Sequence, residues 1–427
     1  MELLVVVAAV AALAFVVRVS LDAPVARRVF PVLMLALAVR LVVHVVLQRG
    51  ALIGYGGDNL WYELWAVDIA DQWKLDGFSY VTADSAGRPF SVALPSNLLA
   101  VIVYLCGGPA PVACTAFVGL LACVLCVIMY RFARLVGADD RAAFRLLVVL
   151  AFMPAFLLHT SDTFKDGFNA LFVVASLYVG VSLVRRFTFA KLLVLVPLLW
   201  ALWNVRPYMT FLCLLPLAVG IIAPKRVISL RTLFAVTVAA VLLAFMPEVV
   251  VDNGPVEMMR EQMDYAQSQA VQRANSTPRV WWRQGSGVQF DDGGNTWNSL
   301  GPRLVYTVLS PFPWTPGGFA LQFSKIDTCL WYLLLAAAVV GARRLWRRER
   351  GAVLVLLLFV VPATVAYATT MSNMGLIFRQ RIPVVMVTSL LSAVAWTRSS
   401  PGEPDPVDTP PDALPEPEEA PRRAVLT

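Results

Sequence analysis

The stretch LLVVVAAVAALAFVVRV, residues 3–19, decides the fold class, because it is apolar throughout except for one arginine near its end. Similar runs recur along the 427-residue chain, of which 59% is hydrophobic and only 15% charged. Soluble domains carry about 25% charged residues, and apolar runs of about 18 or more residues are typical of membrane spans. The runs are continuous rather than alternating, which favours helices over barrel strands. We therefore expect an all-α, polytopic transmembrane bundle of about 11–12 hydrophobic segments.

The apolar runs and the stretches between them divide the chain into four parts. The hydrophobic segments are expected at roughly 3–21, 29–48, 93–106, 111–132, 142–160, 167–184, 190–204, 208–223, 229–247, 328–345, 352–371 and 382–397. The parts are then an N-terminal transmembrane module over 1–247 with a first outer loop at 49–92, an outer loop or cap over 248–327, C-terminal transmembrane helices over 328–397, and a tail over 398–427. The tail is rich in Pro and Glu with few apolar residues, so we expect it to be disordered.

Basic residues set the expected orientation. They cluster at every second loop: Arg131, Arg134, Arg141 and Arg145; Arg185, Arg186 and Lys191; Lys225, Arg226 and Arg231; and Arg343, Arg344, Arg347, Arg348 and Arg350. Cytoplasmic loops carry such an excess, so these loops and the tail are expected inside and the loops between them outside. The basic residues lie between apolar runs, so the net charge of +7 does not indicate nucleic-acid binding.

The segment 93–106 does not fit this alternation. It is short and holds Pro95 and Asn97. We expect it to enter the membrane without spanning it, or to form a broken helix with its neighbour. In the rival arrangement, the acidic loop 49–92 lies inside. The Ala-, Val- and Arg-rich composition favours a bacterial plasma membrane as the location.

The loop at 49–92 contains GYGGDNLWYELWAVDIADQWKLDG, residues 54–77, which places five carboxylates among aromatic residues. Asp58 follows the glycine-rich turn at the expected start of a helix, where an Asp can serve as the N-cap. The apolar side chains recur at helical spacing, which predicts an amphipathic helix at the outer interface; they are Tyr62, Trp65, Ile69 and Trp73. The later acids, Asp68, Asp71 and Asp76, are expected to face water.

A second acidic loop, HTSDTFKDGFNA at residues 159–170, lies at the next outer boundary. Asp162 and Asp166 are four residues apart, so a helix would place both on one face. Such a pair can hold a divalent cation or a substrate hydroxyl. The alternative is an ordinary ion pair with Lys165 at a helix start, which contributes little.

Three arginines are expected at the outer membrane edge, against the usual trend. Arg206 lies in WNVRPYM, and Arg379 and Arg381 lie in GLIFRQRIP. A guanidinium binds phosphate in a bidentate manner, so a lipid phosphate or pyrophosphate is a natural partner. The alternatives are snorkelling to headgroups and an internal ion pair. Arg40 and His44, inside the second span, are expected to stabilise the bundle through a carboxylate partner.

Together these motifs resemble the GT-C superfamily of polyprenyl-phosphate-dependent membrane glycosyltransferases. They are closest to the bacterial relatives of protein O-mannosyltransferases and lipid A aminoarabinose transferases. GGDNLWYELWAVDIADQWKLDG matches the first-loop element of that family, and SDTFKDG matches the second. The resemblance implies that Asp58 is the catalytic base. It also implies that Tyr62 is the aromatic residue of the first element and that Asp166, with Asp162 in reserve, is the acid of the second. With the charged residues discussed above, the expected substrate-binding set is Tyr62, Glu63, Asp162, Lys165, Asp166, Arg206, Arg379 and Arg381. Many relatives carry a second acid where this chain has Asn59.

The resemblance further implies a fold, a reaction and its partners. The fold would be GT-C-like. The enzyme would move a hexosyl or pentosyl group from a polyprenyl-phosphate donor to an envelope glycan, lipid or protein on the outer face of the membrane. The partners would be lipids and glycans. From the spacing of the two acids, and not from the resemblance, we expect Asp166 as a ligand of a divalent cation, Mg²⁺ or Mn²⁺. The alternatives are a polymerase or ligase of lipid-linked glycans, a flippase or transporter, and an assembly scaffold.

Overall fold

The computed structural model describes residues 1–49, 58–82, 93–185, 188–222, 290, 296–315, 319–370 and 374–398. Within these ranges the chain forms helices and no strand, which confirms the all-α prediction. Six of the described helices are long and apolar enough to cross a membrane. They are α1 (Glu2–Ser20), α2 (Ala23–Val43), α5 (Pro111–Leu135), α8 (Asp166–Arg185), α15 (Phe319–Arg348) and α16 (Arg350–Thr370). The protein is therefore a multi-pass, helical membrane protein.

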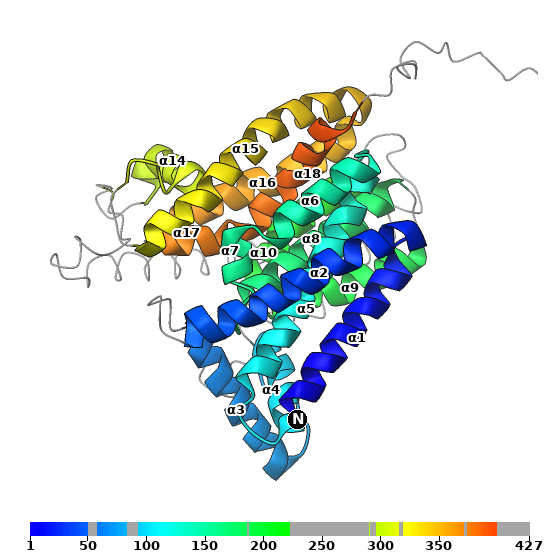
Figure 1. The fold of residues 1–427 in the computed structure, drawn as a ribbon. Coiled ribbons are helices and arrows are strands. Elements are labelled where there is room, and N and C mark those ends of the chain that lie inside the picture. Colours follow the sequence, from blue (N-terminus) through cyan, green and yellow to red (C-terminus); the bar gives the residue numbers. More distant parts are fainter. Residues whose placement is uncertain are drawn as a thin grey trace, which may run out of the picture.

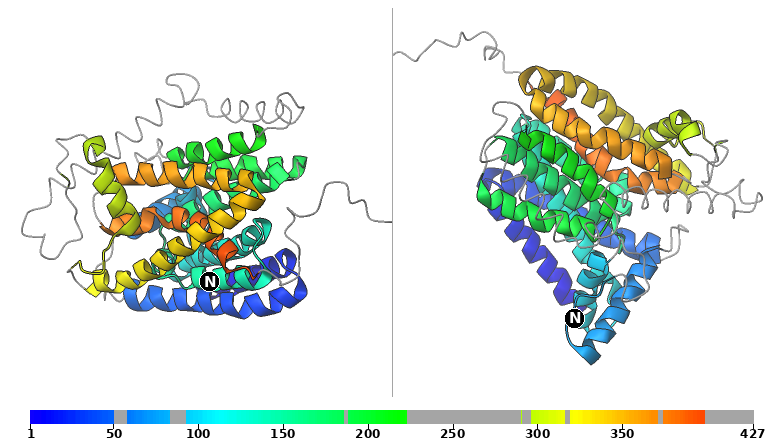
Figure 2. Two further views of the ribbon diagram at one scale, coloured as in Figure 1. Left: turned by 90° about the horizontal axis from the view of Figure 1, so that it is seen from above. Right: turned by 180° about the vertical axis from the view of Figure 1, so that it is seen from behind.

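Shorter helices complete the described part of the chain. Four of them are apolar: α4 (Ala93–Cys106), α9 (Phe189–Trp203), α10 (Pro207–Ile222) and α18 (Ile382–Trp396). The others are η1 (His44–Arg49), α3 (Asp58–Asp76), α6 (Asp140–Ala151), α7 (Pro154–Leu158), η5 (Thr296–Ser299), α14 (Leu300–Leu309) and α17 (Met374–Gln380). In Figure 1 the apolar helices lie side by side as one bundle, and α3 and α4 extend beyond it near the N-terminus. Figure 2 shows the same arrangement from behind.

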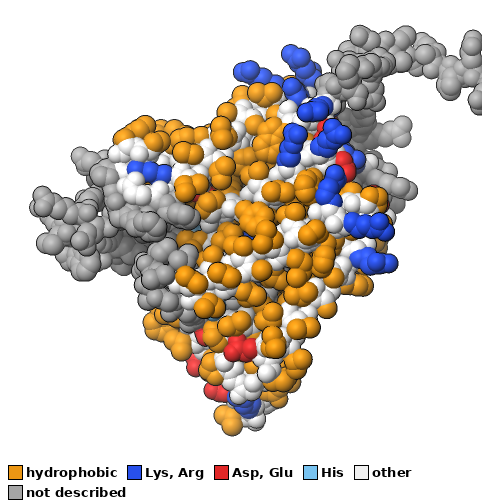
Figure 3. Space-filling view, in the orientation of Figure 1, with side chains coloured by type: hydrophobic (Ala, Val, Ile, Leu, Met, Phe, Trp, Pro, Cys, Tyr) orange, Lys and Arg blue, Asp and Glu red, His pale blue; other side chains and the backbone are white. Residues whose placement is uncertain are grey.

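The two ends of the bundle differ in charge. At one end α1 turns into α2, and Arg28 forms an ion pair with Asp140 at 3.0 Å. Nearby, the Arg344 guanidinium donates to the carbonyl of Ala395 at 2.8 Å. Figure 3 shows Lys and Arg side chains gathered at this end, and acidic side chains near the opposite tip. We call them the basic end and the site end; α3, α4 and the first residues of α5 and α8 lie at the site end.

Two clusters of buried side chains stabilise the fold. The larger cluster joins α2, α5, α6, α8, α10, α15, α16 and α18. Helices α15 and α18 approach closely at Gly341, where an added Cβ would lie 1.7 Å from the Leu391 carbonyl oxygen. The smaller cluster joins α3 and α4 to the site-end residues of α5, α8 and α9. This cluster therefore fixes the first loop against the second loop and the bundle.

Helix α3 buries the face that the spacing of its apolar residues predicts, but its other face is not purely polar, because Leu60, Trp61 and Leu64 are exposed there. Its inward face buries Tyr62, Ile69 and Trp73, and Trp65 is partly buried. The three later acids are exposed: Asp68, Asp71 and Asp76. Helix α4 packs on α3 and has 14 residues. A helix of that length is about 21 Å long, shorter than the roughly 30 Å hydrocarbon core of a bilayer.

One expected span is interrupted. The segment 142–160 was predicted as continuous, but α6 ends at Ala151 and the short helix α7 begins at Pro154. A proline lacks the N–H for the helical ladder and disfavours a helical residue before it, which explains the break. The expected segment 229–247, most of the cap 248–327 and the tail from 399 lie outside the described residues.

Candidate functional site

The site is centred on Asp166, the first residue of α8. Its two carboxylate oxygens each accept a hydrogen bond from a different arginine, Arg206 Nη2 at 2.9 Å and Arg379 Nε at 2.9 Å. The side chain of Asp166 is 1% exposed, that of Arg206 6% and that of Arg379 11%. We call these three residues the ion triplet. The structure thus brings together three predicted site residues from three separate segments.

Local structure explains why these side chains converge. A carboxylate is favoured at the first residue of a helix, where the dipole is positive, and Asp166 starts α8. Arg206 immediately precedes α10, and its Nη1 also donates to the hydroxyl oxygen of Tyr208 at 3.1 Å. Arg379 lies in the last turn of α17, with its guanidinium 5.0 Å from the ring centroid of Phe164.

The ion triplet carries one more positive than negative charge. A guanidinium binds phosphate and other oxyanions through a planar fork of N–H donors, and the triplet brings two such groups to one carboxylate. His159 adds no positive charge at neutral pH, because burial lowers its pKa to about 4. The His159 ring Nδ1 lies 2.6 Å from the carbonyl oxygen of Ala155. The site is therefore suited to bind a phosphate or another oxyanion.

Asp162 belongs to a second network four residues earlier. Its side chain is fully buried, with Oδ2 accepting from Asn59 Nδ2 at 2.8 Å and Oδ1 accepting from the Thr163 backbone N–H at 2.8 Å. His44 Nδ1 lies 3.7 Å from Asp162 Oδ1 and 3.0 Å from Thr115 Oγ1. The expected carboxylate partner of His44 is therefore Asp162.

The start of α3 lies against the second loop. The helix begins at Asp58, the predicted base, whose side chain is outside the described residues. The next residue, Asn59, contacts Asp162 as above. Lys165 Nζ lies 5.9 Å from the ring centroid of Tyr62, so these two predicted binding residues also meet. Glu63 is partly buried on the same helix.

Arg381 lies apart from the ion triplet, although it is only two residues from Arg379. Its guanidinium donates to Asp327 Oδ2 at 3.3 Å and to the Ser310 carbonyl at 2.7 Å. Asp327 Oδ1 accepts from the Ala155 backbone N–H at 2.8 Å. Sequence reasoning missed Asp327, although an acid within an apolar run is a signal, because such residues are rare and usually paired.

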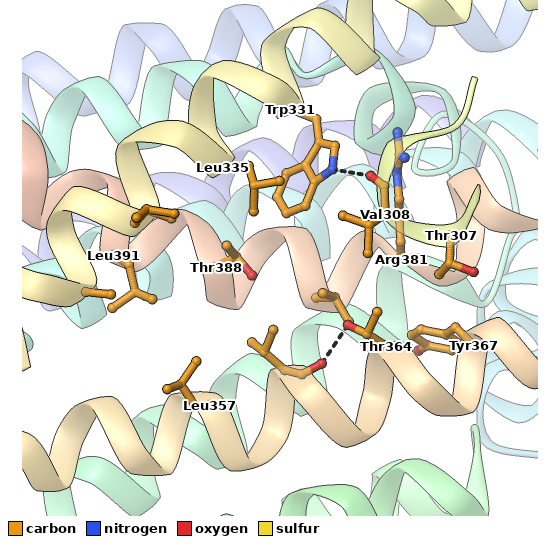
Figure 4. Close-up of a pocket in the computed structure, with 15 residues that line it drawn as sticks. Thr307, Val308, Trp331, Leu335, Leu357, Thr364, Tyr367, Arg381, Thr388 and Leu391 are labelled. Atoms are coloured by element: carbon orange, nitrogen blue, oxygen red, sulfur yellow. Dashed lines mark hydrogen bonds between the residues drawn. The ribbon is translucent and has the colours of Figure 1, made fainter. Parts of the chain in front are cut away.

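An apolar cavity of about 210 Å³ lies beside Arg381, between α14, α15, α16 and α18. In Figure 4, Thr307, Tyr367 and Arg381 lie toward one end of this cavity and Leu357 and Leu391 toward the other. Ten residues of α18 separate Arg381 from Leu391, a rise of about 15 Å. The cavity is therefore long enough to hold several methylene groups of a hydrocarbon chain.

The predicted metal role of Asp166 does not fit its contacts. Both carboxylate oxygens are bonded to guanidinium groups, and a cation would have to displace one of them. The described part of the chain holds no group of three or more His, Cys, Asp and Glu side chains arranged for a metal ion. We therefore derive no step through a metal.

Arg40 is a buried charge near the site. Its Nε donates to Thr160 Oγ1 at 2.8 Å, and its Nη1 donates to the Ala36 carbonyl at 3.0 Å. Its guanidinium lies 5.2 Å from the ring centroid of Phe156. The described contacts of Arg40 are to a hydroxyl, a carbonyl and a ring, instead of the expected carboxylate.

No protein-family model matches the chain, and no curated protein matches it either. Among solved structures, the chain is similar to the apo form of the oligosaccharyltransferase of Archaeoglobus fulgidus, with a TM-score of 0.49 and 13% sequence identity. The similarity covers 85% of this chain and 50% of that one, so this chain spans about half the length of the matched structure. The described residues themselves define a multi-pass, all-helical membrane protein with a buried cationic site.

Proposed function

We propose that the protein is a membrane glycosyltransferase that moves a sugar from a polyprenyl-phosphate donor to an envelope glycan, lipid or protein. The observation that carries this proposal is the ion triplet, in which two arginines meet one buried carboxylate at the end of the bundle where α3 meets the second loop. The proposed location is the outer face of a bacterial plasma membrane, with the basic end in the cytoplasm, in agreement with the positive-inside rule.

The arginines of the ion triplet are proposed to bind the donor phosphate. Arg379 is the more exposed of the two arginines. Its Nη groups are proposed to donate to phosphate oxygens while its Nε remains bonded to Asp166. Negative charge grows on this phosphate as the sugar departs. Fixed guanidinium groups in a dry site stabilise that charge more in the transition state than in the ground state.

Asp58 is the proposed general base. The acceptor hydroxyl oxygen forms a bond to the anomeric carbon of the sugar, and its proton passes to the Asp58 carboxylate. The bond between the anomeric carbon and the phosphate oxygen breaks, and its electron pair stays on the phosphate. The support for this role is the family-like first-loop motif and the place of Asp58 at the start of α3, one residue from the contact with Asp162.

The remaining predicted residues take supporting roles in the proposal. Tyr62, Glu63 and Lys165 are assigned to the sugar, because aromatic rings pack on sugars and charged groups bond to hydroxyls. The apolar cavity is assigned to part of the lipid chain. Arg381, already bonded to Asp327 and Ser310, is assigned to the wall of that cavity and not to the phosphate.

Mass spectrometry of lipid-linked sugars and envelope glycans would test the proposal. Cells carrying the wild type, a deletion, or Asp58→Asn are compared. We expect the deletion and Asp58→Asn to lose the same glycan and to accumulate the same lipid-phosphate sugar. A normal profile in Asp58→Asn, with the protein present in the membrane, would reject Asp58 as the base. That result would favour a polymerase or ligase that uses the arginines alone.

A further inference from the structure

The contact between Asn59 and the second loop is reciprocal. The Asn59 side-chain amide donates to Asp162 Oδ2 at 2.8 Å, and the Thr163 hydroxyl donates to the Asn59 backbone carbonyl at 2.8 Å. We call these two bonds the loop clamp. Asn59 and Asp162 are 6% and 0% exposed, and they lie 103 residues apart in the chain. The clamp therefore fixes the first turn of α3 directly to the loop that leads into Asp166.

The clamp is itself supported from the bundle. His44, which directly follows α2, has its Nδ1 3.7 Å from Asp162 Oδ1, and Thr115 Oγ1 of α5 lies 3.0 Å from the same nitrogen. The Thr163 N–H bond to Asp162 Oδ1 holds the carboxylate in one orientation. Side chains of α2 and α5 thus set the position of Asp162, and Asp162 sets the position of Asn59.

We propose that Asp162 is a positioning residue, which acts through Asn59 to place Asp58 relative to the ion triplet. This inference rests on the proposed function, and it assigns to Asp162 a role other than contact with substrate or cation. Asn59 is bonded to Asp162 and Asp58 is its direct neighbour, so loss of the clamp moves the base. The position of the phosphate-binding arginines is unaffected, because the Asp166 contacts do not include the clamp residues.

The chemistry of the clamp explains why an amide stands at position 59. A carboxylate can only accept hydrogen bonds, and the Asn59 amide supplies the donor. In Asn59→Asp, two carboxylates would face each other at hydrogen-bonding distance in a buried site, which strongly disfavours both being ionised. The exchange Asn59→Asp with Asp162→Asn restores one donor and one acceptor with the polarity reversed.

The test uses the full chain in lipid nanodiscs and follows sugar transfer, with binding of a polyprenyl phosphate and thermal unfolding measured in parallel. We expect Asn59→Asp to lower kcat by roughly 10-fold or more, since a buried bond to a charged group is lost. The double exchange should recover most of this loss. In Asp162→Asn the single amide oxygen can accept from Thr163 or from Asn59 but not from both, so one of the two bonds is lost and kcat should fall by up to about 10-fold. Lipid-phosphate affinity should be unchanged in all three variants.

Asp71→Asn is the matched control, because this carboxylate is exposed on the same helix and is expected to have no effect. If Asn59→Asp fails to fold, the kcat and the lipid-phosphate affinity of Asp162→Asn test the inference. A loss of lipid-phosphate affinity or a loss of kcat near 100-fold in folded Asp162→Asn would show direct contact with the reaction and overturn the inference. If Asp58→Asn is inactive while the double exchange folds without recovering kcat, the positioning role of Asp162 is wrong and the proposed base still stands. Normal turnover in Asp58→Asn would overturn both the inference and the proposed base.

Discussion

Two buried clusters of Arg and Asp each take one arginine from residues 379–381 and differ in how many arginines meet one carboxylate. The ion triplet places two arginines on one carboxylate, whereas Arg381 and Asp327 form a pair of one cation and one anion. The pair also bonds to the Ser310 carbonyl and the Ala155 N–H, so it joins α15 and the start of α18 to α7 and the end of α14. In the pair, Arg381 and Asp327 are each other's counter-ion, and we expect this pair, which we call the balanced pair, to stabilise the fold. In the triplet, two guanidinium groups share one carboxylate, and we propose that these groups also bind the donor phosphate.

The largest expected effect is on stability, at the balanced pair. Arg381→Met would leave the Asp327 carboxylate buried without its cation, which typically costs about 3–5 kcal/mol. We expect a marked fall in the temperature of thermal unfolding in detergent, with lipid-phosphate affinity of the remaining folded protein unchanged.

A double variant sharpens this prediction. In Arg381→Met with Asp327→Asn no charge is left buried, and the amide oxygen can still accept from Ala155. Most of the lost stability should therefore return. If the double variant is as unstable as Arg381→Met, the pair is not an isolated neutral unit and the comparison fails.

The next effect is on activity, at the ion triplet. Arg379→Gln would leave Arg206 and Asp166 as a balanced pair, so the fold should persist while the excess charge disappears. Removing one such group from a transition-state site typically costs about 10²–10³-fold in turnover. Sugar transfer and lipid-phosphate binding would both be measured, and both should fall.

Arg379→Lys is the control that separates the effect of the positive charge from that of the guanidinium geometry. It keeps the positive charge without the planar fork, so partial binding with poor turnover is expected. If Arg379→Gln binds the lipid phosphate as the wild type does, the triplet is a structural cluster like the pair.

These two clusters also show which features of the fold could be predicted from the sequence. The apolar runs predicted the helices, and the period of apolar residues in α3 predicted its buried face. Arg379 and Arg381 were grouped because they are two residues apart, yet α17 ends at Gln380 and α18 begins at Ile382. The change of direction between these helices sends the two side chains to different partners, and no local pattern encodes it.

The candidate site was predictable as a set of residues but not as a set of contacts. Carboxylates and arginines at the same membrane edge were identified from charge alone. The pairing of Asp166 with both arginines depends on how α8, α10 and α17 pack, and the roles of Asn59 and Asp327 depend on neighbours more than 50 residues away. A single amide such as Asn59 carries little local signal, and the signal that Asp327 carries as an acid in an apolar run does not identify its partner.

A smaller effect is expected from pH, at His159 beside the ion triplet. Burial lowers its pKa from an ordinary value of 6.5 to about 4, while Asp166 opposes the shift and Arg379 adds to it. Between pH 6.5 and 4 the unfolded chain binds a proton that the folded chain rejects. This group therefore reduces stability as the pH falls through that window, and contributes no pH dependence above it.

Thermal unfolding measured from pH 7.5 to 4.5 should show a shallower slope of stability against pH in His159→Gln than in the wild type. An unchanged slope would show that the pKa of His159 is the same in the folded and unfolded protein, and His159 would then add positive charge to the triplet below its ordinary pKa of 6.5.

The smallest expected effect concerns the cavity beside the balanced pair. Thr388 lines it, and in Thr388→Phe a ring would occupy space that we assign to the lipid chain. A chain that enters this cavity leaves lipid and not water, so it gains packing contacts without the full hydrophobic effect, and only a few-fold loss of affinity is expected. Binding of a long polyprenyl phosphate should weaken, and binding of a short-chain analogue that reaches only the ion triplet should not. Thr388→Val, similar in size to threonine, is the control for the loss of the hydroxyl. Equal weakening for both chain lengths would mean that the substitution acts through the balanced pair on the triplet, and the two clusters would then be one coupled site.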